Sequence, residues 1–402
     1  MLDAIAPPRL GRRFRWLLAS SWTTNLADGM LVASGPLLVA SQTRDPFLVA
    51  SAAFLQRLPW LLFGLFAGVV ADRVDRRRIV ITANVLRATV LTVVTLTVMG
   101  DAINTGVVLG VVFVLGVAET LADVSTDTVL PMIVDHADLG IGNSRLMFGY
   151  ITTNQLIGPP IGAALFAIGI ASPFATQAIL FAVGALLVSR VGRLPPAAAP
   201  SEHHVMRQIL DGVRWLWGHP PVRTLAITIV SFNVTFGAAW SVLVLWSSER
   251  LGLGDVGFGL LTTTSAVGGV LGASAYPRVE RRVSLADIMR AGLVIETLTH
   301  LTLAVTTTAW VAFVALGLFG VHTAFWATTS TSVRQRAVPT DFQGRVSSVY
   351  MISVQLGMLV GTLIGGIIAD RGDITDPFWF AFVGSAIILV AIWRSLGQIA
   401  HD

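Results

Sequence analysis

Three carboxylates are evenly spaced inside a long apolar stretch of the chain. Glu119, Asp123 and Asp127 stand at i, i+4 and i+8 within the run 106–130. A helix would therefore carry all three on one face. An ionised group in hydrocarbon costs at least ~2.5 kcal/mol, so such residues either function or pair with another charge. We expect Glu119 and Asp123 to bind protons or a cationic ligand, and we place Asp127 at the edge of the membrane, just before Pro131.

A fourth carboxylate, Asp28, is isolated in the apolar run 15–40. The chemistry open to it is reversible protonation or the binding of a cationic substrate. The alternative is a static ion pair, because Arg57 and Arg87 also stand in apolar runs and need acidic partners. Either Asp28 or Glu119 can supply such a partner.

The elements that carry these residues must be membrane-spanning helices. Of 402 residues, 54% are hydrophobic and only 12% are charged, whereas soluble domains carry about 25% charged residues. Cysteine is absent, which excludes disulfides, thiolate metal sites and cysteine nucleophiles. Runs long enough to cross a bilayer predict twelve spans, at 15–40, 47–71, 79–99, 106–130, 146–170, 173–191, 222–246, 256–276, 285–306, 309–331, 346–369 and 377–395.

The charges between these spans predict an orientation. All 27 basic residues are arginines, which suggests a bacterial genome rich in G and C. With a cytoplasmic N-terminus, the arginine-rich connections all fall on one side, and only Arg44, Arg250 and Arg371 fall on the other. This asymmetry follows the positive-inside rule, so we expect both termini in the cytoplasm of a bacterial cell. Because the basic residues follow the loops, we expect no nucleic-acid partner.

A long connection divides the chain near its middle. The proline-rich and alanine-rich segment 193–221 separates 1–192 from 222–402, and it contains an amphipathic stretch that predicts an interfacial helix, either a plain linker or a regulatory element. Shifting the second half by 200 residues superposes Arg145 on Arg345, and a shift of 208 superposes Asn25 on Asn233. We therefore expect two six-helix halves.

The segment GVVADRVDRRR at 68–78 resembles the cytoplasmic signature of the major facilitator superfamily. The residues that fit the signature are Gly68, Asp72, Arg73, Arg76 and Arg77. Asp75 stands where the family has a second glycine, and the corresponding site of the second half has Tyr276 in place of Asp72. The alternative is an ordinary positive-inside loop.

The segment GPPIG at 158–162 is similar to the glycine-proline element of the superfamily's antiporters. Pro159 and Pro160 remove backbone donors, and Gly158 and Gly162 allow a close neighbour. Asn154 stands where the antiporter pattern has a glycine. A plain kink without meaning for transport direction remains the alternative.

Together with ETLADVSTDTVLPMIV, FQGRVSSVY at 342–350 and GTLIGG at 361–366, these segments resemble the branch of enterobactin exporters and of macrolide and multidrug efflux proteins. The resemblance implies an all-α membrane fold of twelve helices in which spans one, four, seven and ten line a cavity. It also implies a lock on the inward side, in which Asp127 bonds Arg76 or Arg77 and to which Arg345 belongs. The cavity candidates implied are Asn25, Asn233, Phe236, Trp240, His322, Phe325 and Trp326.

The function expected from these features is proton-coupled export of an amphipathic small molecule, with Asp28, Glu119 and Asp123 as the protonatable groups. An uptake symporter of the same fold is the alternative, and an intramembrane enzyme or receptor is the least favoured reading. No zinc-protease, serine-hydrolase or ATP-binding motif is present. We expect no cofactor or metal, a monomer, and lipid, the transported molecule and protons as partners. Glu296 and His300, spaced i, i+4, are expected to neutralise each other.

Overall fold

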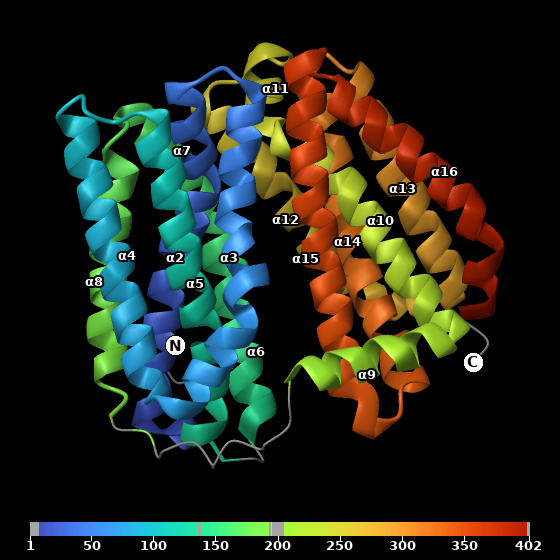
Figure 1. Cartoon of the computed structure of the whole chain (residues 1–402), viewed down its shortest axis with the longest axis horizontal. Helices are drawn as coiled ribbons and strands as arrows, with labels where there is room; N and C mark the ends of the chain where they lie inside the picture. Colours follow the sequence, from blue (N-terminus) through green and yellow to red (C-terminus); the bar gives the residue numbers. More distant parts are fainter. Residues whose placement is uncertain (1–7, 136–137, 193, 195–204, 400–402) are drawn as a thin grey trace. The chain divides into compact units, whose positions relative to one another are not determined.

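The computed structural model describes residues 8–135, 138–192, 194 and 205–399. Within these ranges the side chains of 65–73, 127–128, 205–209, 221, 335, 340–344 and 397–399 are not described. Every regular element in the described ranges is a helix (Figure 1). Ten helices of this part of the chain are long and apolar enough to cross a membrane. The protein is therefore an all-helical, multi-pass membrane protein.

The other two expected spans, 15–40 and 146–170, also lie in helical segments but fall outside these ten. The first belongs to α2, Gly11–Gln42, whose polar side chains, Asp28 among them, lower its hydropathy. The second is divided among three successive elements. Their bounds are α6 Leu139–Gly149, η3 Tyr150–Ile157 and α7 Gly158–Ile168.

The chain forms two compact units. Unit 1 comprises Met1–Thr43, Leu55–Ser201 and Gly254–Thr263, and unit 2 comprises Arg44–Phe54, Glu202–Leu253 and Thr264–Asp402. Besides the elements above, unit 1 contains η1 Pro8–Leu10, most of α3 Pro46–Arg73, α4 Arg76–Met99, α5 Thr105–Ile133 and α8 Ser172–Ser189.

Helices α2, α4, α5, α7 and α8 of unit 1 pack closely on one another. At the end where the N-terminus lies, Phe14, Leu17, Val80, Leu130 and Val188 form a buried core. Farther along α4 and α5 the contact is made by small residues, Ala83, Ala118 and Ala122. Small side chains let helix backbones approach, and in a bilayer such packing replaces the hydrophobic effect as the cause of helix association.

Helix α2 also packs closely against the segment that contains the double proline. The chain has π-helical geometry through η3 and returns to α-helix at Gly158. Pro159 and Pro160 have no N–H to donate to the preceding turn, and the Gly158 N–H bonds the carbonyl of Thr153 in the wider π pattern. A Cβ at Gly29 would overlap the backbone of Asn154, and one at Gly162 would overlap the backbone of Met30.

Unit 2 contains the remaining helices, several of which lie along one another. They are α9 Val205–Gly218, α10 Pro220–Ser241, α11 Leu243–Glu249, most of α12 Asp255–Glu280, α13 Leu285–Val305, α14 Ala309–Ala337, α15 Thr340–Arg371 and α16 Asp376–Ile399. A core formed by Leu225, Phe232, Leu293, Trp326 and Leu396 joins α10, α13, α14 and α16.

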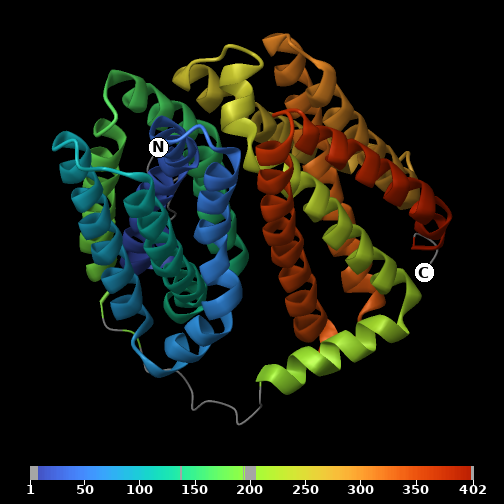
Figure 2. The same cartoon turned by 45° about the horizontal axis from the view of Figure 1, so that its top comes forward.

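Helix α9 runs across the ends of α10 and α15 in both views of the molecule (Figure 1, Figure 2). Gly212 and Leu216 are buried on the packed side, and a Cβ at Gly212 would crowd the backbone carbonyl of Arg345. Leu210 and Trp217 are exposed on the other side. The exposed side also carries the charged Arg214, and the interfacial position of α9 stays a prediction.

Candidate functional site

A polar cavity of about 50 Å³ lies inside unit 1. By the usual measure of one water per 10–15 Å³, it has room for roughly three to five water molecules. Its polar lining comes from α2, α4 and α5, which the small-residue contacts of unit 1 hold close together. The polar residues that line it are Ser20, Ser21, Thr24, Asn25, Asp28, Asn84, Arg87, Asp123 and Thr126.

An ion pair crosses this cavity. Arg87 Nη1 lies 3.5 Å from Asp28 Oδ2, and the two side chains are 3% and 18% exposed. The ring of Phe181 lies 5.0 Å from the Arg87 guanidinium carbon, in the geometry of a cation–π contact. Arg87 Nη2 has no hydrogen-bond acceptor among the described residues. The guanidinium is therefore charged, buried and incompletely bonded, and Asp28 is its direct counter-ion.

Two more acids surround this pair. Glu119 and Asp123 on α5 act electrostatically on Arg87, and Glu119 also acts on Arg57 of α3. Glu119 is half-buried, whereas Asp123 is exposed. The structure therefore brings together the three acids that the sequence nominates. It also contains the Asp28–Arg87 pair that the sequence offers as an alternative, and Asp28 is not the isolated carboxylate that its sequence neighbourhood suggested.

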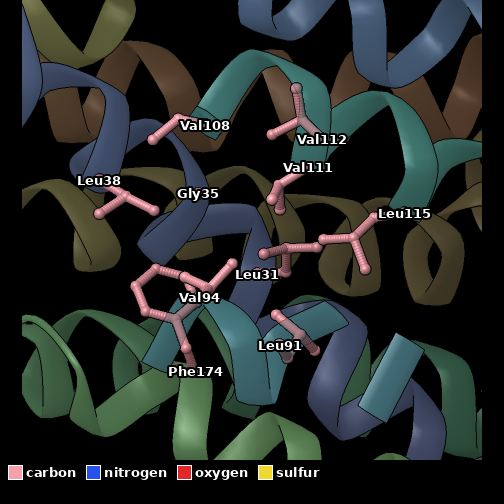
Figure 3. Close-up of a pocket in the computed structure, with 10 residues that line it drawn as sticks. All are labelled: Leu31, Gly35, Leu38, Leu91, Val94, Val108, Val111, Val112, Leu115 and Phe174. Carbon is pink, nitrogen blue, oxygen red and sulfur yellow. The ribbon is translucent and has the colours of Figure 1, made fainter. Parts of the chain in front are cut away.

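Beyond the ion pair, a smaller gap between the same helices is lined by apolar residues. Leu31 and Leu38 of α2, Leu91 and Val94 of α4, and residues of α5 and α8 surround a gap of about 10 Å³ (Figure 3). This volume is at the lower limit for one water molecule. Of the residues that line the polar cavity, Asp28 and Arg87 lie farthest along α2 and α4 toward this gap.

Two of the expected lock residues bond their surroundings in ways that their sequence spacing does not reveal. Arg77 Nη2 donates to the Ser189 carbonyl at 2.6 Å and so satisfies the C-terminal end of α8. Arg76 Nη1 lies 3.0 Å from the Met132 sulfur. The side chains of Gly68, Asp72, Arg73 and Asp127 lie outside the described residues, so the expected bond from Asp127 to Arg76 or Arg77 stays a prediction.

The residue that departs from the family signature has its own structural role. Asp75 is the N-cap of α4, and its carboxylate accepts a hydrogen bond from the Arg77 N–H at 3.0 Å. An aspartate directly before a helix start is the usual sign of such a cap. Sequence reasoning could have found this role, but it treated Asp75 only as a substitution.

Two of the cavity candidates of unit 2, Phe236 and Trp240, belong to an aromatic cluster. The Phe236 ring centroid lies 4.4 Å from that of Trp240 and 5.3 Å from that of Phe319, a residue that the sequence did not nominate. Phe325 instead meets Tyr276 edge-on at 5.5 Å. Trp326 belongs to the core of unit 2.

The repeat-related asparagines make the same local bond. Asn25 Nδ2 donates to the Ser21 carbonyl at 2.8 Å, and Asn233 Nδ2 donates to the Ile229 carbonyl at 2.7 Å. Both bonds run back four residues along the residue's own helix. The amide oxygens are left to accept other donors.

The histidine of this set has an acidic partner on another helix. His322 Nε2 on α14 lies 2.9 Å from Glu296 Oε2 on α13, and His300 Nε2 lies 3.9 Å from Glu296 Oε1. The expectation that Glu296 and His300 neutralise each other is therefore incomplete, because the shorter bond goes to His322. Residues 26 positions apart on two helices give no periodic signal, and sequence reasoning missed the pair.

Comparison with known proteins agrees with this architecture. The sequence profile of the family described as "Transmembrane secretion effector" matches residues 3–397. Macrolide efflux protein A of Streptococcus pyogenes is 22% identical over 392 residues, which is 94% of both chains. Multidrug efflux pump Tap of Mycolicibacterium fortuitum is 26% identical and covers 90% of both chains. The staphyloferrin A transporter of Staphylococcus aureus is 24% identical and covers 85% of both.

Solved structures show the same fold at lower identity. Nucleoside transporter NupG superposes with a TM-score of 0.78 at 12% identity, covering 96% of this chain and 100% of its own. A bacterial homologue of the iron transporter ferroportin, in its inward-facing state, superposes with a TM-score of 0.75 at 17% identity, covering 97% and 99%. These likenesses concern the fold alone.

Proposed function

The chain belongs to the transmembrane secretion effector family of the major facilitator superfamily, and on that premise we propose that it is a proton-coupled antiporter that exports an amphipathic small molecule. It is a membrane transporter and not an enzyme. The observation that carries the proposal is the buried Asp28–Arg87 pair beside a polar cavity, in a chain whose relatives include macrolide and multidrug efflux proteins.

The proposal includes the twelve-span arrangement, with halves 1–192 and 222–402 joined by 193–221, a monomeric state and both termini in the cytoplasm. Ten helices that can span a membrane, together with α2 and the α6–η3–α7 succession, support the count. The excess of arginine in alternate connections supports the orientation.

In the proposed mechanism Asp28 carries the proton. When the carboxyl is ionised, it pairs with Arg87 across the cavity. When it takes up a proton from the external side, the pair loses its charge attraction, and Arg87 turns toward Glu119 and Asp123, which already act on it. The Arg87 charge persists in both states, because a guanidinium keeps its proton in proteins. The switch therefore exchanges one acidic partner of Arg87 for others as the transporter alternates.

The substrate class follows from the relatives and from the aromatic cluster. The clustered rings of Phe236, Trp240 and Phe319 are aromatic surfaces of the kind that binds hydrophobic or cationic molecules. Because one relative is a staphyloferrin A transporter, a siderophore belongs in the set of test compounds beside macrolides and cationic dyes.

The test is accumulation of ethidium, erythromycin and a ferric siderophore in cells that express wild type, Asp28→Asn or Asp101→Asn, with and without a protonophore. Asp101 is a matched control because it is exposed between α4 and α5 at φ 52°, which asparagine tolerates. Wild type and Asp101→Asn should lower accumulation of at least one compound, and Asp28→Asn or the protonophore should abolish the difference. Higher accumulation in wild-type cells would favour the uptake symporter instead.

A further inference from the structure

We propose that Glu296, His322 and His300 form a second proton-binding site, located within unit 2 and coupled to transport. The inference rests on the proposed proton-driven function, and it adds a site that the Asp28 mechanism does not use. The three residues lie on α13 and α14. Their proposed ligand is the transported proton.

The three groups are in contact and removed from water. Glu296 is 6% exposed, His300 0% and His322 3%. The carboxylate has one oxygen 2.9 Å from His322 Nε2 and the other 3.9 Å from His300 Nε2. One carboxylate thus stands between two imidazole rings.

The hydrogen bonding of the cluster is incomplete, unlike that of a purely structural network. His322 Nδ1 and both ring nitrogens of His300 are buried without a hydrogen-bond partner among the described residues. Buried polar groups are nearly always bonded, so unsatisfied ones call for an explanation, and a catalytic or transport role is one. Three open ring nitrogens around one carboxylate provide places to which a proton can move.

The net charge of the three groups changes with each proton that they bind or release. With one proton on the three groups, for example an ionised Glu296 beside an imidazolium, the cluster is neutral. Loss of that proton leaves a net charge of −1, and gain of another gives +1. A net charge buried in a membrane protein is costly, so each transfer favours a rearrangement that readmits water or a counter-ion.

Among the described side chains, no other ionisable group acts on Glu296. The charged groups that act on it are the two histidines. Arg290 donates to Asp287 and to the Trp393 carbonyl, and Arg334 stacks on Tyr350 at 3.6 Å. The other ionisable residues of the surrounding elements lie toward the helix ends. They are Asp287 and Arg290 on α13, Arg334 and Arg336 on α14, Asp255, Tyr276, Arg278 and Glu280 on α12, Arg223 on α10, and Asp376 and Arg394 on α16.

The backbone around the cluster is shaped to hold it and to let it move. A Cβ at Gly292 would overlap Nδ1 of His322, so this glycine makes room for the ring. Next to the histidine, a Cβ at Gly320 would overlap the Ser265 carbonyl of α12, and one at Gly272 would meet the Val321 carbonyl at 2.8 Å. Such close, small-residue contact between α12 and α14 lets one helix slide along the other. The proton enters and leaves when that movement exposes the cluster to one aqueous side and then to the other.

The first test measures proton binding directly and needs no substrate. Full-length protein labelled with ¹⁵N-histidine is titrated in nanodiscs between about pH 5 and pH 9, the range in which histidines change charge. His322→Gln and His300→Gln assign the signals. We expect both rings to respond to pH in wild type and the midpoints to move by about 1 pH unit or more in Glu296→Gln. Glu280→Gln, at the end of α12, is the matched control and should leave them unchanged. The proposal would be overturned if the ¹⁵N signals of the two rings did not change with pH, or if their midpoints were the same in wild type and Glu296→Gln.

The second test asks whether the proton is used for transport. Proteoliposomes with wild type, Glu296→Gln, Gly292→Ala or Glu280→Gln are assayed for ethidium movement driven by a pH gradient and for ethidium exchange at equal pH. Glu296→Gln and Gly292→Ala should lose gradient-driven ethidium movement by roughly tenfold or more and keep ethidium exchange within about twofold. Glu280→Gln should behave as wild type. Retained exchange shows that the variants are folded. A merely structural role would lower both activities together.

The outcomes separate this inference from the proposed function. If wild type moves ethidium along the gradient and Glu296→Gln does so equally well, the second site is refuted and the proposed function stands. If wild type exchanges ethidium but ignores the gradient, the proposed proton coupling fails, and the transport role of the cluster fails with it.

Discussion

The ion pair between Asp28 and Arg87 predicts that replacing the aspartate destabilises the protein more than replacing the arginine does. At 3.5 Å and an effective dielectric constant of about 20, two unit charges attract by about 5 kcal/mol. Asp28→Asn removes this attraction and leaves a buried guanidinium, which typically costs about 3–5 kcal/mol. The face of Phe181 and the charges of Glu119 and Asp123 remain to stabilise it. We therefore expect a loss of about 3 kcal/mol in the free energy of unfolding, at the low end of that range.

The reverse substitution should be milder. In Arg87→Gln the remaining carboxyl of Asp28, 18% exposed beside a cavity with room for water, can become neutral by taking a proton. A guanidinium has no such option. We expect Arg87→Gln to cost about 1–2 kcal/mol, and the double variant Asp28→Asn/Arg87→Gln to be more stable than Asp28→Asn alone, because it buries no unpaired charge.

Equilibrium unfolding in mixed dodecylmaltoside and SDS micelles, followed by tryptophan fluorescence, measures all four proteins. The interaction term of the double-mutant cycle isolates the pair. Equal losses for the two single variants, or a double variant whose loss is the sum of the two, would refute the reasoning that the guanidinium is buried and dependent on Asp28.

Three further predictions concern helix packing, capping and substrate contact. Gly162→Ala should lower the free energy of unfolding by about 1–3 kcal/mol, because its Cβ would overlap the main chain of α2. In the same unfolding assay Gly110→Ala, whose Cβ would meet nothing within 4 Å, should raise it by about 0.5–1 kcal/mol. Equal effects of the two substitutions would contradict the packing account. Asp75→Ala should cost about 1 kcal/mol through loss of the α4 cap and Asp75→Asn almost nothing, and equal losses would assign the role to its charge. Trp240→Ala should weaken ethidium binding roughly tenfold in a fluorescence titration. Trp310 is 68% exposed, and Trp310→Ala should leave ethidium binding unchanged. Unchanged binding in Trp240→Ala would show that the aromatic cluster does not contact the substrate.

Much of the architecture was predictable from the sequence because hydropathy and arginine placement constrain a membrane protein strongly. A bilayer sets the helix length, and unsatisfied backbone groups exclude other structures. Ten predicted spans correspond to helices that can cross a membrane. The double proline predicted an irregular helix but not its form. The π-helical stretch over Tyr150–Ile157 lies against Gly29 of another helix, and this contact is not visible in the local sequence.

The candidate site was predictable only in part. The types and spacing of Asp28, Glu119 and Asp123 identified the acids, since charges in apolar runs are conspicuous. Which arginine pairs with Asp28 depends on how α2 and α4 pack, and local patterns carry no information on that. The bond from His322 to Glu296 was missed for the same reason. A residue such as Gly292 was not nominated, because its importance arises only from the ring that lies against it.

The central claim, that proton movement drives export through Asp28, is tested most directly by purified protein in liposomes that contain a pH-sensitive dye. Addition of erythromycin to wild type should cause protons to move in the direction opposite to the drug. Asp28→Asn should bind the drug but move no protons. Erythromycin transport by wild type without proton movement, or proton movement that persists in Asp28→Asn, would contradict the account.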